Sequence, residues 1–209
     1  WGDEGHKRYL SSYFDMYPGK NGLSAPWRHG DWLKINTDGQ QPEIVINTGG
    51  RPLGLDVDGQ GRLLVADAMK GLLAVNLAGG PAKLRSVLTN INHPVPEDRI
   101  RYADAVSIDP RGNVWLTDAS RAFGAKEVGS TFEASVLDIL EASCTGRVIV
   151  LEPVTGKNRV AINGLCFPNG MAFTSDGKSL LLSETGRYRI LKIDLAALSL
   201  VRATQGRMR

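Results

Sequence analysis

Two oxygen-bearing side chains, Asp104 and Asn169, stand at equivalent positions of a repeated sequence pattern, each where an apolar strand is expected to begin. Oxygen donors that converge on one point suit a hard cation such as calcium, with ligands at about 2.3–2.6 Å. The pattern therefore indicates a metal site that contains Asp104 and Asn169. The alternative is that both side chains only satisfy backbone amides where the strands begin.

The pattern that positions these residues occurs three times, as LGLDVDGQGRLLVADA (53–68), DAVSIDPRGNVWLTDA (104–119) and NGMAFTSDGKSLLLSET (169–185). The first two copies align without a gap, and the third has one extra residue in the turn around Lys178. Each copy consists of an alternating apolar strand, a turn with Asp and Gly, a second apolar strand and an acidic residue. Such self-similarity predicts stacked supersecondary units.

Further apolar stretches complete each unit. They are GLLAVNL (71–77), KLRSVLT (83–89), GRVIVLEP (146–153), NRVAING (158–164), RYRILKIDL (187–195) and the beginning of a strand near Leu200. Ahead of the first copy, DWLKIN (31–36) and PEIVIN (42–47) have the form of the last two strands of an earlier unit. A four-stranded meander repeated around an axis is a propeller blade, so the predicted fold is an all-β propeller of four-stranded antiparallel blades.

The predicted organisation is a segment without a clear strand pattern over 1–30 and a partial propeller over 31–209. The expected blades cover 31–50 in part, 51–90, 102–164 and, incompletely, 167–209. About three blades plus fragments cannot close a ring, because propellers close with roughly four to eight blades. We therefore expect the remaining blades to come from a missing part of the chain or from another chain.

Two insertions separate the strands: a Pro-containing loop over 90–102 and a segment over 121–143. In the second insertion, Phe132, Val136, Ile139 and Leu140 fall on one helical face, and Ser130 or Thr131 can cap the start with Glu133 close by. We expect a short helix of about three turns above one face of the propeller. Loops over one face commonly carry function.

Other acidic residues favour structural roles. Asp67, Asp118 and Glu184 recur in every copy, and this recurrence is more typical of a hydrogen-bonding device than of a catalyst. The stretch from Asp56 to Asp67 mimics part of an EF-hand loop, but Leu63, Leu64 and Val65 predict a strand hairpin without flanking helices. An EF-hand is therefore not expected.

The remaining nucleophiles and metal ligands are few. Cys144 and Cys166 are expected to be half-buried thiols, with a single disulfide as the alternative. Among the histidines, only His93 lies in a loop that could reach a channel mouth, and we expect it to be an exposed loop residue. The chain lacks a nucleophile elbow, a phosphate-binding loop and Cys/His zinc spacing.

The bulk composition excludes two classes of partner. The net charge of +3 over 209 residues is mild and scattered, which argues against nucleic acid. No apolar run approaches the roughly 18 residues of a membrane span, and we expect no signal peptide within the residues of this chain. We expect a soluble protein of unknown compartment, whose N-terminal segment could be missing because the chain begins at Trp1.

Several of these segments resemble the strictosidine synthase-like proteins, which belong to the wider superfamily of gluconolactonases (the senescence marker protein group) and paraoxonases. The resemblance rests on GGRPLGLDVDGQGRLLVADAMKGLLAVN (49–76), YADAVSIDPRGNVWLTDAS (102–120) and GLCFPNGMAFTSDGKSLLLSETGRYRI (164–190). The stretch TFEASVLDILEASCTGRVIVLEPVTG (131–156) is similar to the helix-bearing insertion of the bacterial members. The resemblance covers about 31–195.

The resemblance implies a six-bladed propeller with calcium in the central channel and hydrolysis of lactones or esters. The family's Asn in the FxNG motif matches Asn169, and its Asn or Asp at the equivalent strand start of the preceding blade matches Asp104. Two further ligands are implied, a Glu of the first blade and an Asp of the fifth, and neither has a match here. The catalytic Glu of plant strictosidine synthases also falls outside the chain, which resembles the first half to two-thirds of the enzyme.

The leading hypothesis is a calcium-dependent hydrolase of lactones or esters that acts on a small molecule, with Asp104 and Asn169 as ligands of calcium or another divalent cation. Asp104 is alternatively the base that activates water. One alternative function is an amine–aldehyde condensing enzyme, a lyase like strictosidine synthase that requires no metal. The other is a non-catalytic propeller used for binding.

Overall fold

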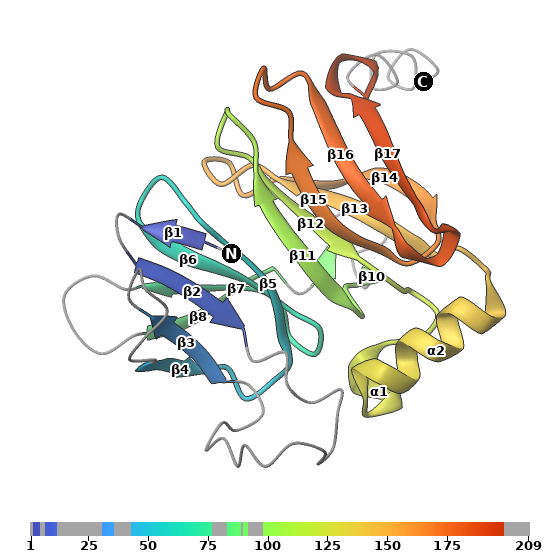
Figure 1. Ribbon diagram of the computed structural model, residues 1–209, viewed down its shortest axis with the longest axis horizontal. Coiled ribbons are helices and arrows are strands. Elements are labelled where there is room, and N and C mark those ends of the chain that lie inside the picture. Colours follow the sequence, from blue (N-terminus) through green and yellow to red (C-terminus); the bar gives the residue numbers. More distant parts are fainter. Residues whose placement is uncertain are drawn as a thin grey trace.

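The computed structural model describes the backbone of residues 2–4, 7–11, 31–35, 43–76, 83–88, 90–91 and 98–198, and the side chains of 45–76 and 98–198. The described chain is mostly β, with antiparallel sheets and few helices (Figure 1). The prediction of antiparallel β-sheets is confirmed. The number of blades and the closure of a ring stay predictions.

The first two sheets each contain four strands in chain order. The strands of the first sheet are β1 (Gly2–Glu4), β2 (Lys7–Ser11), β3 (Asp31–Ile35) and β4 (Glu43–Asn47). The strands of the second sheet are β5 (Pro52–Val57), β6 (Arg62–Asp67), β7 (Gly71–Asn76) and β8 (Lys83–Leu88). The expected end strands of an earlier unit are thus β3 and β4, while β1 and β2 lie in a segment whose sequence shows no clear strand pattern.

The next two sheets follow the same meander. The third sheet contains β11 (Ala103–Ile108), β12 (Val114–Asp118), β13 (Gly146–Leu151) and β14 (Asn158–Leu165). The fourth contains β15 (Pro168–Phe173), β16 (Ser179–Glu184) and β17 (Arg189–Asp194), with the 3-10 turn η2 (Thr185–Arg187) between the last two. Two short strands, β9 (Asn90–Ile91) and β10 (Asp98–Arg99), pair within the first insertion. The strand predicted near Leu200 lies outside the described residues.

Alternation of side chains along each strand packs the sheets face to face. On β6, Leu63 and Val65 contact Val45 and Ile46 of the first sheet, whereas Leu64 belongs to the core between the second and third sheets. The next core, between the third and fourth sheets, contains Trp115, Val148, Val150, Leu165, Leu180 and Leu182. The middle strands therefore carry runs of apolar residues, such as Leu63–Ala66 on β6 and Val148–Leu151 on β13.

The first strands of the last three sheets lie side by side, with β11 between β5 and β15 (Figure 1). The approach of β5 to β11 requires a glycine, since a Cβ at Gly54 would lie 2.6 Å from the Cα of Ala105. Farther along, Ile108 N donates to Asp56 Oδ2 at 3.0 Å and links the same two strands. Equivalent positions on these strands are therefore neighbours.

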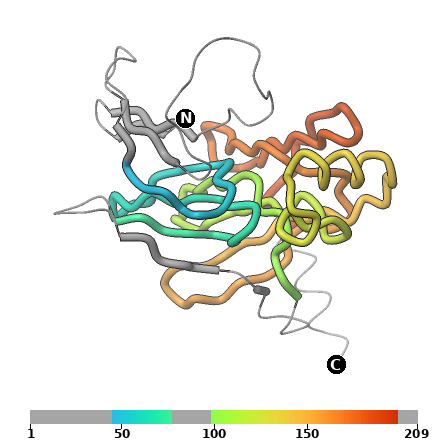
Figure 2. The backbone as a smooth tube through the Cα atoms, turned by 90° about the horizontal axis from the view of Figure 1, so that it is seen from below, coloured from blue at the N-terminus to red at the C-terminus, as the bar shows by residue number. Residues whose placement is uncertain are grey.

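The second insertion forms α1 (Ala125–Val128) and α2 (Thr131–Glu141), which lie together at one side of the molecule (Figures 1 and 2). Ser130 caps α2 by accepting a hydrogen bond from Glu133 N, so the predicted capped helix is confirmed. The helices follow β12, whose last residue, Asp118, pairs with the first residue of β11. They therefore lie at the end of the sheets where β11 begins.

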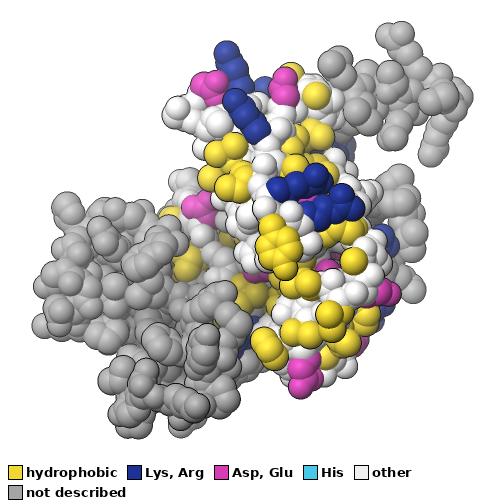
Figure 3. Space-filling model, turned by 45° about the vertical axis from the view of Figure 1, so that its right-hand side comes forward, with side chains coloured by type: hydrophobic (Ala, Val, Ile, Leu, Met, Phe, Trp, Pro, Cys, Tyr) yellow, Lys and Arg dark blue, Asp and Glu magenta, His cyan; other side chains and the backbone are white. Residues whose placement is uncertain are grey.

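The apolar face of α2 is turned outward. Phe132 and Leu140 are 58% and 77% exposed, whereas Ala134 and Asp138 are buried against the sheets. Figure 3 shows hydrophobic side chains in several exposed patches, mixed with charged side chains, on the side of the molecule that it presents. Among the described residues, no helix has the length and apolar character that a membrane span requires.

The repeated acidic residues hold the segment that leads into each first strand, as predicted. Asp67 Oδ1 accepts from Arg51 N, Asp118 Oδ1 accepts from Tyr102 N, and Glu184 Oε1 accepts from Cys166 N, at 2.8–3.0 Å. Each donor lies one or two residues before its first strand. Their recurrence thus reflects one hydrogen bond that each of these three sheets makes.

The EF-hand-like stretch is a hairpin between β5 and β6, as predicted. Asp58 Oδ1 accepts hydrogen bonds from Gln60 N and Arg62 N, both at 2.9 Å, and these bonds close the turn. No helix flanks this stretch within the described residues.

The expectation of two free thiols was wrong. Cys144, between α2 and β13, forms a disulfide with Cys166, between β14 and β15. The two cysteines are 22 residues apart in sequence, but β13 and β14 run antiparallel, with Gly146 opposite Leu165. The register of this strand pair therefore brings the residues that flank it together.

Candidate functional site

The two predicted ligands lie at the starts of neighbouring strands. Asp104 is the second residue of β11, and Asn169 is the second residue of β15. Two residues before them, the equivalent residues Tyr102 and Phe167 pack edge to face, with ring centroids 5.2 Å apart. This contact brings the beginnings of the two strands together.

Asp104 is a buried carboxylate without compensation. It is only 7% exposed, and no hydrogen bond or ion pair reaches it from the side chains and backbone that the structure describes. Burial alone raises the pKa of Asp104 to about 7. An unpaired carboxylate in such a place is costly unless it is protonated or a cation neutralises it.

Asn169 is half-buried, and its side-chain amide has no hydrogen bond within the described part of the chain. A carboxylate and an amide oxygen are ligands of the kind that calcium binds. The third equivalent position is Leu53 on β5, which packs against apolar side chains instead. Two of the three neighbouring strands thus carry an oxygen-bearing side chain at the predicted position.

An apolar cluster packs at the strand starts, here called the strand-start cluster. Its buried members are Ala68, Tyr102, Ala119, Ala125, Ala134 and Phe167. The helices contribute Ala125 and Ala134, and Tyr102 Oη donates to the carbonyl of Thr131 at 3.0 Å. The cluster thus fixes the helical insertion next to Asp104 and Asn169 and lowers the dielectric constant around them.

Within the described residues, no three His, Cys, Asp or Glu side chains converge as a metal-binding group. Asp104 and Asn169 fit a calcium ion in donor chemistry, and the unpaired carboxylate supports that fit. They supply two of the six to eight oxygen ligands that calcium takes. All three histidines, including His93, lie outside the described residues.

Sequence reasoning missed a second buried carboxylate near the site, Asp138 of α2. It is 2% exposed, burial raises its pKa, and Oδ1 lacks a partner in the described part of the chain. A hydrogen bond with the buried Ser120, which follows β12, opposes that rise and attaches the inner face of α2 to the sheet. The available signal was Asp138 as the single acid among the apolar residues of VLDIL (136–140).

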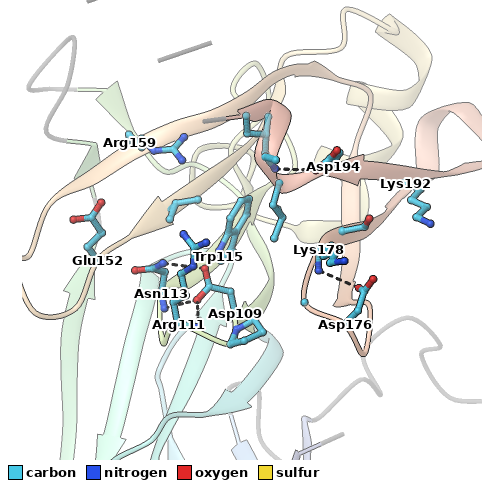
Figure 4. A pocket seen from close by; sticks show the side chains of 17 residues that line it. Asp109, Arg111, Asn113, Trp115, Glu152, Arg159, Asp176, Lys178, Lys192 and Asp194 are labelled. Atoms are coloured by element: carbon cyan, nitrogen blue, oxygen red, sulfur yellow. Dashed lines mark hydrogen bonds between the residues drawn. The ribbon is translucent and has the colours of Figure 1, made fainter. Parts of the chain in front are cut away.

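A hollow of about 890 Å³ lies at the opposite end of the strands, between the third and fourth sheets. Asp109, Trp115, Lys178 and Asp194 are among the residues that line it (Figure 4). Asp109 Oδ2 already accepts from Trp115 Nε1 at 3.1 Å and from Asn113 Nδ2 at 2.9 Å. Neither Asp104 nor Asn169 lines this hollow, so it is separate from the predicted site.

The sequence matches the family model described as strictosidine synthase over residues 104–196. It is 35% identical over 150 residues to strictosidine synthase-like protein 4 of Arabidopsis thaliana, covering 72% of this chain and 37% of that protein. It is 30% identical over 154 residues to the adipocyte plasma membrane-associated protein of Danio rerio, covering 73% and 35%. The chain thus spans little more than a third of the length of these relatives.

Solved structures share the fold at low sequence identity. A gluconolactonase from Xanthomonas campestris aligns with a TM-score of 0.60 and 19% identity, over 78% of this chain and 50% of that one. Regucalcin from Agrobacterium tumefaciens, a calcium-binding protein, aligns with a TM-score of 0.55 and 15% identity, over 80% and 47%. These similarities concern the arrangement of the sheets.

Proposed function

Because the chain belongs to the superfamily of strictosidine synthase-like proteins and gluconolactonases, we propose that it carries part of the active site of a calcium-dependent hydrolase of lactones or esters. In this proposal, Asp104 and Asn169 bind the cation where β11 and β15 begin. A six-bladed ring around the site is part of the same proposal.

The observation that carries the proposal is the buried carboxylate of Asp104, which has no partner in the part of the chain that the structure describes. Every repeated acid among the described residues has backbone donors, whereas Asp104 has none. A buried charge without partners is retained where a ligand neutralises it. The gluconolactonase and calcium-binding regucalcin neighbours support a lactone or ester as substrate and calcium as the cation.

Calcium, when bound, would polarise the carbonyl of the substrate and stabilise the negative charge that develops on its oxygen. Asp104 would hold the cation through its carboxylate oxygens, and Asn169 through Oδ1. The strand-start cluster would exclude water from one side and strengthen these electrostatic contacts. Alternatively, Asp104 would accept a proton from the attacking water, because its raised pKa is close to neutral pH.

The test is calcium titration of the full-length protein by calorimetry, in parallel with Asp104→Ala and the control Asp176→Ala. Asp176 is an exposed carboxylate whose bonds stay within its own turn, with Thr174 and Lys178. We expect saturable binding that Asp104→Ala weakens at least about tenfold, or 1.4 kcal/mol, and that the control retains. A panel of lactones and esters would then identify the substrate.

Two results would overturn this function. If the intact protein binds no calcium, the hydrolase mechanism as stated is wrong, and a metal-free amine–aldehyde condensing enzyme or a binding module becomes the better assignment. If calcium binds equally well to Asp104→Ala, the cation occupies another place, and Asp104 is not its ligand.

A further inference from the structure

The disulfide between Cys144 and Cys166 lies beside a positive charge. Arg187 Nε lies 2.9 Å from Sγ of Cys166, and Arg187 Nη2 lies 3.7 Å from Sγ of Cys144. Cys166 is 5% exposed, whereas Cys144 is partly accessible to solvent. A permanent cation next to a sulfur atom favours its thiolate and makes it a better leaving group.

The backbone next to Arg187 is fixed by the turn η2. Gly186 N donates to the carbonyl of Cys166 at 3.0 Å, and Thr185 N donates to the carbonyl of Phe167 at 3.1 Å. A Cβ at Gly186 would lie 3.0 Å from the carbonyl oxygen of Cys166, so a glycine suits this close approach. The turn thus holds Arg187 against the disulfide by backbone contacts.

The backbone around the disulfide is strained. Ala142, Cys144, Phe167 and Tyr188 are the four non-glycine residues with positive φ in the described ranges, at 50–53°. Each lies within two residues of Cys144, Cys166 or Arg187. The left-handed conformation costs a side-chain-bearing residue about 1 kcal/mol, and it persists where the surrounding structure imposes it.

In the described part of the chain, the disulfide is one of several attachments of the helix α2 to the sheets. Tyr102 Oη holds the carbonyl of Thr131 at the first turn, and Asp138 bonds to Ser120 farther along. Cys144 belongs to the segment that follows the C-terminal end of α2, and the disulfide anchors this segment to Cys166. Cys166 lies three residues before Asn169. Cleavage would remove the covalent link between the segment after α2 and Cys166, whose own backbone stays bonded to Glu184 and to the turn η2.

We propose that Cys144–Cys166 is a thiol–disulfide exchange site whose reactant is a dithiol reductant, and that reduction loosens α2 next to the strand starts. One thiolate of the dithiol attacks Sγ of Cys144, the more accessible sulfur. The S–S bond breaks, and its electron pair leaves on Sγ of Cys166, where Arg187 stabilises the charge. This step yields a mixed disulfide with Cys144.

The second thiolate of the reductant then attacks the reductant's own sulfur in the mixed disulfide. It forms the oxidised cyclic reductant and releases the thiolate of Cys144. In total the dithiol gives up two electrons and two protons, and the two cysteines receive them. This exchange does not depend on the proposed calcium site.

The test measures the reduction of the native full-length protein by dithiothreitol. Iodoacetamide labelling and mass spectrometry follow Cys144 and Cys166, and hydrogen exchange follows residues 131–141. Arg187→Gln removes the cation beside the sulfurs. Arg189→Gln is the matched control, because Arg189 is similarly exposed, at 50% against 53%. Arg189 bonds to Glu184 at 2.6 Å, whereas Arg187 lies 4.0 Å from the same carboxylate and contacts both sulfur atoms.

We expect Arg187→Gln to slow reduction several-fold, Arg189→Gln to leave the rate unchanged, and reduction to increase hydrogen exchange in α2. The double variant Cys144→Ser/Cys166→Ser should show that faster exchange without reductant. If that variant does not fold, reduction of the native protein gives the same readout. The proposal is overturned if the cysteines are labelled only on global unfolding, if Arg187→Gln is reduced as fast as the parent, or if exchange in α2 does not change.

Discussion

Asp104 and Asp118 are two buried carboxylates on the paired strands β11 and β12, and their surroundings are opposite. Asp118 is 0% exposed, and its Oδ1 accepts from Arg101 N at 3.1 Å and from Tyr102 N at 2.8 Å. Its Oδ2 accepts from Arg147 Nε at 2.9 Å. Asp104, at 7% exposure, has no partner among the residues that the structure describes.

The difference separates a structural acid from a candidate functional one. The acid at the position of Asp118 recurs in the other sheets as Asp67 and Glu184, and it always binds the backbone before the first strand. The residue equivalent to Asp104 is Leu53 in the second sheet and Asn169 in the fourth, so the fold does not require a carboxylate at this position. Burial alone therefore does not distinguish the two acids, whereas the lack of partners among the described residues makes Asp104 the candidate.

The largest expected effect comes from Asp118→Ala. The substitution leaves the buried guanidinium of Arg147 without this carboxylate and leaves the N–H groups of Arg101 and Tyr102 without their acceptor. Breaking such a pair by removing one partner costs about 3–5 kcal/mol. We expect a loss of that size in the free energy of unfolding, measured by urea denaturation in chelator.

The matched variant is Asp104→Ala, which removes a carboxylate of similar burial from the neighbouring strand. It should not reduce the stability of the metal-free protein by a comparable amount. Equal losses in the two variants would break the comparison, because Asp104 would then have a structural partner.

The pH dependence of stability sharpens the same contrast. Burial raises the pKa of Asp104 to about 7 in the folded protein, so between pH 4 and 7 the folded state binds more protons than the unfolded state. The contribution of Asp104 to the free energy of unfolding therefore falls as pH rises through this window, by up to about 4 kcal/mol. Asp104→Asn should remove this contribution. At pH 8 we expect the variant to be more stable than the parent by about 2 kcal/mol, which is less than the full contribution because the buried amide of Asn also needs a hydrogen-bond partner.

The measurement is urea denaturation of the parent and Asp104→Asn at pH 4 to 8 in chelator. Asp176→Asn is the control, since its carboxylate is exposed and should leave the difference between pH 4 and pH 8 unchanged. If the parent and Asp104→Asn show parallel pH profiles, the carboxylate is compensated by a group elsewhere in the protein.

The repeat made the sheets predictable from the sequence. Alternating apolar residues and Asp–Gly turns located β5, β6, β11, β12, β15 and β16, because each copy must place the same side chains between sheets. The helix α2 was also predicted, through its periodicity and the Ser130 cap. The recurrence of Asp67, Asp118 and Glu184 correctly indicated a structural role.

Features outside the repeat were not predictable in the same way. The pairing of Cys144 with Cys166 depends on the register of β13 with β14 and on left-handed backbone at Ala142, Cys144 and Phe167, which side-chain-bearing residues rarely adopt. The position of Arg187 beside the sulfurs depends on the turn η2. The sequence did locate Asp104 and Asn169 at neighbouring strand starts, but the lack of partners around Asp104 required side-chain positions.

The smallest effect is expected from Asn169→Ala. Asn169 is half-buried at a strand start and makes no side-chain hydrogen bond within the described residues, so its loss should change the free energy of unfolding by less than about 0.5 kcal/mol. As a neutral ligand it should contribute less to calcium binding than the carboxylate of Asp104, and we expect affinity to fall by up to about tenfold, or 1.4 kcal/mol. Calorimetry and urea denaturation of this variant separate the two quantities. A large loss of stability in chelator would place Asn169 with Asp118 among the structural residues, because a side chain that only binds a cation has no effect on the metal-free fold.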